Sequence, residues 1–163
     1  MFDLAPQTFY YSLSSLMQLH KAENILEVAC GTGKLLSFAM DRKRKECQYL
    51  ASDIASNMVE KSKDNLRQHF LKYESKLTFE EWCQKQNLHF QVLNAEEPIP
   101  KVKPFDRIFC NLALMITPDP LKLLKNMHSH AAKGCLFGVS VWGNKEQNTL
   151  FNAIRESLIE SKI

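Results

Sequence analysis

The sequence contains no long apolar segment. No run of apolar residues approaches the roughly 18 that a membrane-spanning helix requires. The first residues, Met1 to Pro6, also lack the basic and then apolar order of a secretory signal peptide. The five cysteines are odd in number and include no C-x-x-C pair. These absences predict no membrane partner, reduced thiols and a cytoplasmic location.

Clustered metal ligands and net charge are also scarce. No set of Cys and His residues has the spacing of a zinc site, so we expect no metal. The net charge of +3 is too small to predict a nucleic-acid partner by itself. The basic run Arg42–Lys45 has no aromatic residues among it, and we interpret it as a solvated turn rather than a polyanion site.

The most informative stretch that is present runs from Ile25 to Gly33 and reads Ile-Leu-Glu-Val-Ala-Cys-Gly-Thr-Gly. Its apolar residues predict a buried strand, and the two glycines predict a tight turn that leaves room for a ligand. The apolar residues Leu35, Leu36, Phe38 and Ala39 predict a helix after the turn. Asp53 lies twenty positions after Gly33, at the end of the next expected strand. This order predicts a nucleoside site.

The spacing of the turn separates the nucleotide classes that use such sites. A dinucleotide fingerprint requires a small residue where this chain has Leu36. A phosphate loop requires Gly and Ser or Thr where the chain has Val28 and Leu35. An NAD-dependent reductase and a phosphate-binding loop are therefore disfavoured. S-adenosylmethionine remains, because it has no phosphate.

Four segments resemble motifs of the class I S-adenosylmethionine-dependent methyltransferases of the small-molecule type. Residues 27–33 resemble the first motif, with Ala29 where the family often has Gly. Residues 52–58 resemble the second, with Asp53 as the ribose-binding acid, residues 93–96 the segment beside the adenine, and residues 105–111 the fourth strand. The family commonly has Asp where this chain has Asn94, and Asn111 precedes Leu112 rather than the Pro-Pro-aromatic run of amine methyltransferases. The cofactor-binding residues that the resemblance implies are Glu27, Ala29, Cys30, Gly31, Gly33, Asp53, Ile54, Met58, Asn94, Ala95, Glu96 and Asn111.

Several of these residues have a second interpretation. Glu27 binds either the amino group of the ligand or nearby backbone amides. Asp53 binds ribose or caps a helix, and Met58 lines the adenine pocket or belongs to the core. The catalytic residues are unknown. Tyr10 and Tyr11 on the first helix and Asn111 at the end of the fourth strand are the candidates.

Alternating strands and helices predict one α/β domain over residues 1–163, doubly wound and Rossmann-like. We expect five parallel strands over 24–30, 48–53, 88–94, 105–111 and 135–142, with helices on both faces. Residues 1–22 form an N-terminal helical cap, and residues 74–87 a structural insertion that includes a helix begun by a Thr78–Glu81 capping box. Asp119 and Pro120 begin a later helix, and Asn144 with Gln147 caps the last one. The resemblance implies the strand order 3-2-1-4-5.

The resemblance also implies a sixth and a seventh strand, which the 163 residues lack. Strand five would then be an exposed apolar edge, so we expect a fragment of a longer protein, or a homodimer or partner bound over that edge. The predicted function is methyl transfer by in-line displacement from S-adenosylmethionine to a small-molecule acceptor, with S-adenosylhomocysteine as product. The alternative is a non-catalytic cofactor-binding or partner subunit.

Overall fold

The computed structural model describes residues 4–70, 76–99, 102–144 and 149–160, and contains one five-stranded sheet. All strand pairs are parallel, and the order is β3-β2-β1-β4-β5. The predicted sheet and its order are therefore confirmed. The strands are β1 (Asn24–Val28), β2 (Gln48–Asp53), β3 (Leu88–Val92), β4 (Phe105–Asn111) and β5 (Ala131–Ser140).

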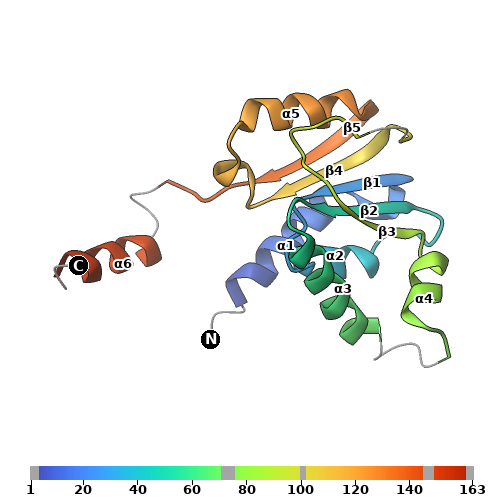
Figure 1. The fold of residues 1–163 in the computed structure, drawn as a ribbon, viewed down its shortest axis with the longest axis horizontal. Helices are drawn as coiled ribbons and strands as arrows, with labels where there is room; N and C mark the ends of the chain where they lie inside the picture. The colour runs from blue at the N-terminus through green and yellow to red at the C-terminus, as the bar shows by residue number, and fades with distance from the viewer. Residues whose placement is uncertain (1–3, 71–75, 100–101, 145–148, 161–163) are drawn as a thin grey trace.

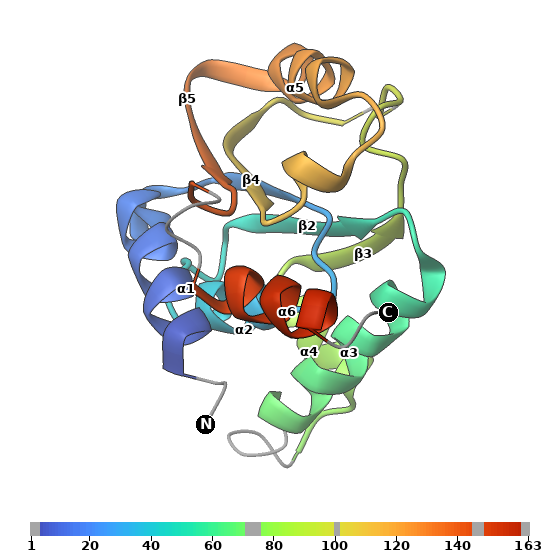
Figure 2. The same cartoon turned by 90° about the vertical axis from the view of Figure 1, so that its left-hand side faces the viewer.

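Helices cover both faces of the sheet, as predicted. Figures 1 and 2 show α1, α2 and α3 on one face and α5 on the other. In Figure 1, α6 stands apart from the sheet, beyond the carboxyl end of β5. The helices are α1 (Leu4–Leu16), α2 (Lys34–Met40), α3 (Ser56–Phe70), α4 (Phe79–Lys85), α5 (Pro120–Ser129) and α6 (Thr149–Glu160), with the short 3₁₀ turns η1 (Leu19–Lys21) and η2 (Leu114–Ile116).

The two faces of the sheet have separate apolar cores because side chains alternate along each strand. Ile25 of β1 belongs to the core under α1 to α4, whereas Leu26 and Val28 belong to the core under α5. Glu27, a buried acid, lies in the middle of β1 on the face that α1 to α4 cover. The other residues of β1 are mostly apolar, as is usual for parallel strands that are covered on both faces.

Two helix starts follow from their capping residues. Thr78 accepts a hydrogen bond from the Glu81 amide, and the Glu81 carboxylate accepts one from the Thr78 amide, so the predicted capping box is confirmed. Trp82 of this helix is buried against Phe70. Asp119 caps α5 through the Lys122 amide, with Pro120 at its first position.

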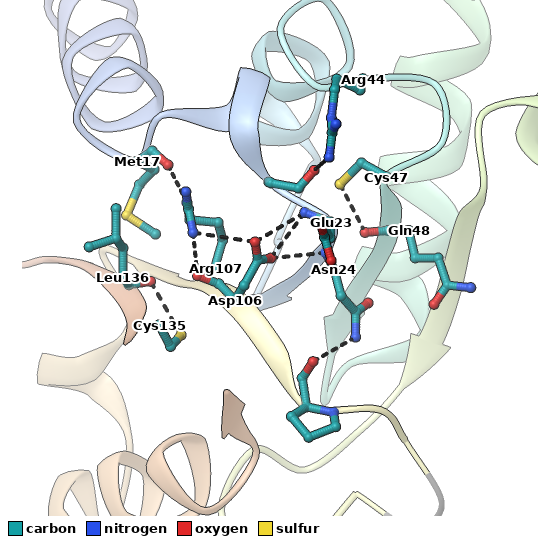
Figure 3. Close-up of polar contacts among 12 residues, drawn as sticks. Met17, Glu23, Asn24, Arg44, Cys47, Gln48, Asp106, Arg107, Cys135 and Leu136 are labelled. Carbon is teal, nitrogen blue, oxygen red and sulfur yellow. Dashed lines mark hydrogen bonds and ion pairs between the residues drawn. The ribbon is translucent and has the colours of Figure 1, made fainter. Parts of the chain in front are cut away.

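A polar cluster at the beginning of β4 fixes the entry into β1 (Figure 3). The Asp106 carboxylate accepts hydrogen bonds from the amides of Glu23 and Asn24, at 2.9–3.2 Å. Arg107 is buried and donates from Nε to the carbonyl of Met17, at the end of the N-terminal helix. These bonds join the N-terminal cap to the central strands, and so fix where the glycine turn after β1 lies.

Some sequence predictions were wrong in detail. The run Arg42–Lys45 is not simply a solvated turn, because Lys43 is buried and its Nζ donates to the carbonyls of Arg44, Cys47 and Gln86. β5 begins at Ala131 and ends at Ser140, four and two residues earlier than expected. The predicted Asn144–Gln147 cap of the last helix lies partly outside the described residues. No helix within the described ranges is long and apolar enough to cross a membrane.

Candidate functional site

The turn after β1 has a left-handed backbone at three positions. Ala29, Gly31 and Gly33 have φ angles of 54°, 53° and 74°. Glycine adopts such angles without strain, whereas an alanine is strained there. The turn is held in place because the Cys30 amide donates to the Ser52 carbonyl of β2.

The two glycines are needed for different reasons. A Cβ at Gly31 would meet no atom within 4 Å, so the space beside this residue is open. A Cβ at Gly33 would collide with Ser62 of α3, whose Cα would lie only 3.2 Å away. Gly33 therefore permits close packing of a helix, while Gly31 leaves room for a ligand.

Asp53 ends β2 beside this open space. One carboxylate oxygen accepts from the Gly31 amide at 2.9 Å and the other from the Ala55 amide at 3.0 Å. The Ala55 amide precedes α3, which begins at Ser56, so Asp53 holds the turn before this helix rather than capping its first turn. Each carboxylate oxygen has a further lone pair for a ligand donor, so these contacts leave a role in ribose binding open.

A cavity of about 410 Å³ extends from Gly31 across the carboxyl ends of the strands. This is where open α/β sheets bind ligands, and the volume suits a small molecule. Its lining includes nine of the predicted cofactor-binding residues: Ala29, Gly31, Asp53, Ile54, Met58, Asn94, Ala95, Glu96 and Asn111. Met58 is partly exposed here rather than in the core.

The loop that closes one side of this cavity is attached to α5. The side chain of Asn94 accepts from the Glu96 amide at 3.0 Å, and Glu96 accepts from the Asp119 amide at 3.0 Å. The Asn126 amide group donates to the carbonyl of Ala95 at 2.8 Å. The oxygen of Asn94 thus already has a partner within its own loop.

A second cavity of about 180 Å³ continues on the other side of Gly31. Ala29, Gly31, Asn111 and Leu112 line both cavities. The smaller cavity is further lined by Glu27, Cys30 and Tyr10. Together the two cavities form one site that is divided at Gly31 and Asn111, with an apolar end and a more polar end.

Glu27 lies in this polar end and is almost fully buried. Its carboxyl group accepts a hydrogen bond of 2.7 Å from the hydroxyl of Tyr49, on β2. Burial raises the pKa of Glu27 to about 8, the Tyr49 hydrogen bond lowers it, and the charge of Asp53 raises it further. Glu27 is therefore largely protonated at neutral pH in the free protein. Among the described residues, the hydrogen-bond partner of this carboxyl group is the Tyr49 hydroxyl and not a backbone amide.

Asn111 has a fixed orientation at the boundary of the two cavities. Its side-chain oxygen accepts from the Ser140 hydroxyl at 2.6 Å, and the Ser140 oxygen accepts from the Leu112 amide at 3.0 Å. Leu112 has a φ angle of 53°, another strained position beside the site. The Ser140 hydroxyl therefore fixes the side-chain oxygen of Asn111.

The structure does not bring both tyrosine candidates to the site. Tyr10 lines the smaller cavity, with its ring 5.9 Å from that of Phe38. Tyr11 is exposed and lines a different hollow, where the Arg42 guanidinium lies 5.1 Å from its ring. The Cys30 thiol has a pKa of about 12, chiefly because it is buried, so it is a poor nucleophile.

Tyr49, Ser140 and Ser62 are the residues that sequence reasoning missed. Each contacts a predicted residue from another element: Tyr49 holds Glu27, Ser140 holds Asn111, and Ser62 packs on Gly33. Strand register could have indicated two of these contacts, since Ser140 is directly opposite Asn111, and Tyr49 is opposite Ile25, two residues before Glu27. Another cavity, of about 480 Å³, lies among residues from the amino ends of β1, β2 and β4, such as Asn24 and Phe105, and is lined by none of the predicted site residues.

The site fits an adenosyl amino acid. Open space beside Gly31, an acid at the rim and an apolar cavity match the adenosine part, and the polar end matches an amino-acid part. The described residues contain no cluster of three or more His, Cys, Asp or Glu side chains able to hold a metal ion.

Comparison with known proteins identifies the class. Residues 19–158 match a family described as a methyltransferase domain. The chain therefore belongs to the class I S-adenosylmethionine-dependent methyltransferase domains. It is 31% identical over 138 residues to malonyl-[acyl-carrier protein] O-methyltransferase 1 of Ilyobacter polytropus. The matched segment covers 85% of this chain and 43% of the relative. The chain thus spans less than half the length of this curated relative.

Solved structures share the fold. A SAM-dependent methyltransferase from Aquifex aeolicus has a TM-score of 0.66 at 19% identity, covering 86% of this chain and 67% of that one. The [4+2]-cyclase SpnF has a TM-score of 0.65 at 17% identity, covering 83% of this chain and 44% of that chain. The plantazolicin methyltransferase BpumL, solved with S-adenosylhomocysteine, has a TM-score of 0.57 at 15% identity, covering 79% and 45%. At these identities the likeness concerns the fold alone.

Proposed function

We propose that this chain binds S-adenosylmethionine and takes part in methyl transfer to a small-molecule acceptor. The observation that carries the proposal is the pair of cavities that meet at Gly31 and Asn111. The larger, apolar cavity suits adenosine and the smaller one suits the amino-acid end. The junction would then hold the reacting centre, beside Asn111 at the end of β4.

The chain's own residues supply alignment and shielding. When bound, S-adenosylmethionine supplies a methyl group on a sulfonium, whose charge already activates the leaving group. Gly31 leaves the ligand room to lie against the backbone, and Asp53 offers its free lone pairs to the ribose hydroxyls. The apolar side chains around the larger cavity exclude water, which favours displacement at carbon. A base is needed only if the acceptor must lose a proton.

The relative from Ilyobacter supports an oxygen acceptor, because its name describes an O-methyltransferase of malonyl-[acyl-carrier protein]. We therefore propose a carboxylate or hydroxyl oxygen of a small acyl compound as the class to test first. The rival proposal is a cofactor-binding subunit without catalysis. The fold likeness to a cyclase favours keeping this rival, since proteins of this fold are not confined to methyl transfer.

The decisive variant is Asp53→Ala. We expect it to weaken S-adenosylhomocysteine binding by about 10- to 100-fold, because hydrogen bonds to a charged group contribute about 1.5–3 kcal/mol. Titration calorimetry on the 163-residue chain measures this. Asp64→Ala, an exposed acid of α3 paired with Arg67, is the control and should leave affinity unchanged.

Two results would contradict the proposal: unchanged affinity in Asp53→Ala, or no binding by the unmodified chain. Circular dichroism must show that Asp53→Ala is folded, because Asp53 also holds the Gly31 and Ala55 amides. Isotope-labelled S-adenosylmethionine with short acyl acceptors then separates the enzyme from the rival. Binding without any label transfer favours the non-catalytic subunit.

A further inference from the structure

The cavity of about 480 Å³ at the amino ends of the strands is separate from the site described above. It shares no lining residue with the two cavities that meet at Gly31. Its lining includes Leu50 of β2, which packs against the core under α5, and His89 of β3, which is paired with Leu50. Paired residues of neighbouring strands point to the same face, so the cavity lies on the α5 side of the sheet.

This part of the sheet is open because the segment after β3 is held to α5 instead. Within the described residues no helix lies between β3 and β4. The Asn126 side chain donates to the carbonyl of Glu97 at 2.6 Å, and the Ile99 amide donates to Nε2 of His130 at 3.1 Å. Figure 1 shows this segment running toward α5. The amino-terminal parts of β2 and β3 are therefore left without a helix over them.

The polar side chains around the cavity have unused hydrogen-bonding groups. Gln48, His89, Gln91 and Lys103 line it and are all exposed. None of these four side chains makes a hydrogen bond or an ion pair with the described part of the chain. Among the described residues that line the cavity there is no Asp or Glu. The ammonium group of Lys103 is thus a positive charge that no lining carboxylate balances.

The cavity also has an apolar part and a fixed edge. Leu50, Val102 and Phe105 supply apolar surface to its lining. The side chain of Asn24, on β1, donates to the carbonyls of Lys103 and Pro104, at 3.1 Å each. This bond fixes the backbone of Lys103 beside the sheet. Apolar surface with a few convergent polar groups is typical of a small-molecule site.

We propose that this cavity binds a small organic anion, a phosphate or carboxylate group joined to an apolar body. Lys103 and His89 donate to the anionic group, and the amides of Gln48 and Gln91 bond to its remaining oxygen atoms. The apolar body lies against Leu50. An unbalanced positive charge attracts anions and disfavours cations, so the charge of the ligand decides binding. This site goes beyond the proposed function and does not depend on it.

The test uses three small ligands that carry the same ring and different charged groups. Phenyl phosphate and benzoate are anions, and benzylamine is a cation. We expect NMR titration of the full 163-residue chain to shift the backbone amide signals of Leu50, His89 and Gln91 with phenyl phosphate, with benzoate or with both. Benzylamine should leave these signals unchanged. A response to one anion alone identifies the phosphate or the carboxylate as the preferred group.

Two variants test the assigned residues. Lys103→Gln should weaken binding of the anion about 2- to 5-fold, as expected for an exposed charge pair. Gln91→Trp, at an exposed strand position, should fill the cavity and block the anion. Lys34→Gln is the matched control, because Lys34 lines the smaller cavity beside Gly31. It should leave binding unchanged.

Four results would overturn the proposal: no shift with either anion, shifts centred on Gly31, equal shifts with benzylamine, or unchanged affinity in Lys103→Gln. Weakening by Lys34→Gln would place the anion in the other site and overturn it as well. Binding of S-adenosylhomocysteine is measured separately on the same sample. Its loss would contradict the proposed function and leave the anion site standing.

Discussion

Ala29 illustrates how single residues are strained around the site. Its φ angle of 54° is one that a non-glycine residue adopts at a cost of about 1–2 kcal/mol. Leu112, on the opposite side of the junction, has a φ angle of 53°. Both residues line both cavities. The Leu112 amide donates to Ser140 of β5, and the amide of Cys30, next to Ala29, donates to the Ser52 carbonyl of β2. Strain of this kind is concentrated at functional sites because the surrounding structure must enforce it.

Glu27 links the site to pH. Its pKa of about 8 in the folded protein exceeds the 4.5 of an exposed glutamate, so the folded chain keeps a proton that the unfolded chain releases. The contribution of Glu27 to stability is therefore complete below pH 4.5 and is lost as the pH rises through about 8.

We predict that Glu27→Gln removes this dependence. Between pH 5 and 8 the unmodified chain should lose up to about 1.4 kcal/mol per pH unit relative to the variant. Urea unfolding at several pH values measures the difference, and Glu60→Gln, an exposed acid of α3, is the control. Parallel pH profiles for Glu27→Gln and the unmodified chain would contradict the prediction.

At the scale of elements, the connection between α2 and β2 is more ordered than its charged sequence suggests. Lys43 is only 8% exposed, and its three carbonyl partners belong to its own loop and to the residue after α4. Burial lowers the pKa of Lys43, and nearby acidic groups act against this shift. A cation in this position joins the beginning of β2 to the turn before β3.

We predict that Lys43→Met destabilises the fold by about 1–3 kcal/mol, because one buried and two partly buried carbonyl groups lose their donor. Lys45→Met, two residues away and exposed, should change stability by less than about 0.5 kcal/mol. Chemical denaturation measures both. Equal stability of the two variants would show that water replaces the Lys43 ammonium at no cost.

Helix starts were the elements best predicted from sequence. The Thr78–Glu81 box and the Asp119–Pro120 start depend on residues within one turn, and both are present. Predictions that depended on distant partners were weaker. The basic run looked solvated because one of the carbonyl partners of Lys43, that of Gln86, lies 43 residues along the chain.

At the scale of the whole molecule, the sheet ends in an apolar edge. β5 is the terminal strand, and Phe137, Val139 and Val141 are 39–47% exposed. Alternation places these residues on the face that α5 covers only in part. An unpaired apolar edge favours pairing with another strand, so the homodimer or partner at this edge stays a prediction.

We predict that the isolated chain self-associates through β5. Light scattering should give a mass that rises above 18.8 kDa with concentration, and Val139→Lys should reduce this rise, because a lysine opposes edge pairing. Leu121→Lys, at an exposed apolar position on α5, is the control and should have no effect. A constant monomer mass would exclude pairing between copies of this chain.

The sequence by itself determined the α/β class, the glycine turn, the acid at the end of β2 and the exclusion of dinucleotide and phosphate loops. These features depend on local patterns: apolar periodicity, turn residues and fixed spacings. The tertiary structure decided which residues meet. Strand register brought Ser140 to Asn111 and Tyr49 to Glu27, and helix packing brought Ser62 to Gly33. Such contacts join segments 20 or more residues apart, and no local pattern encodes which of them will touch.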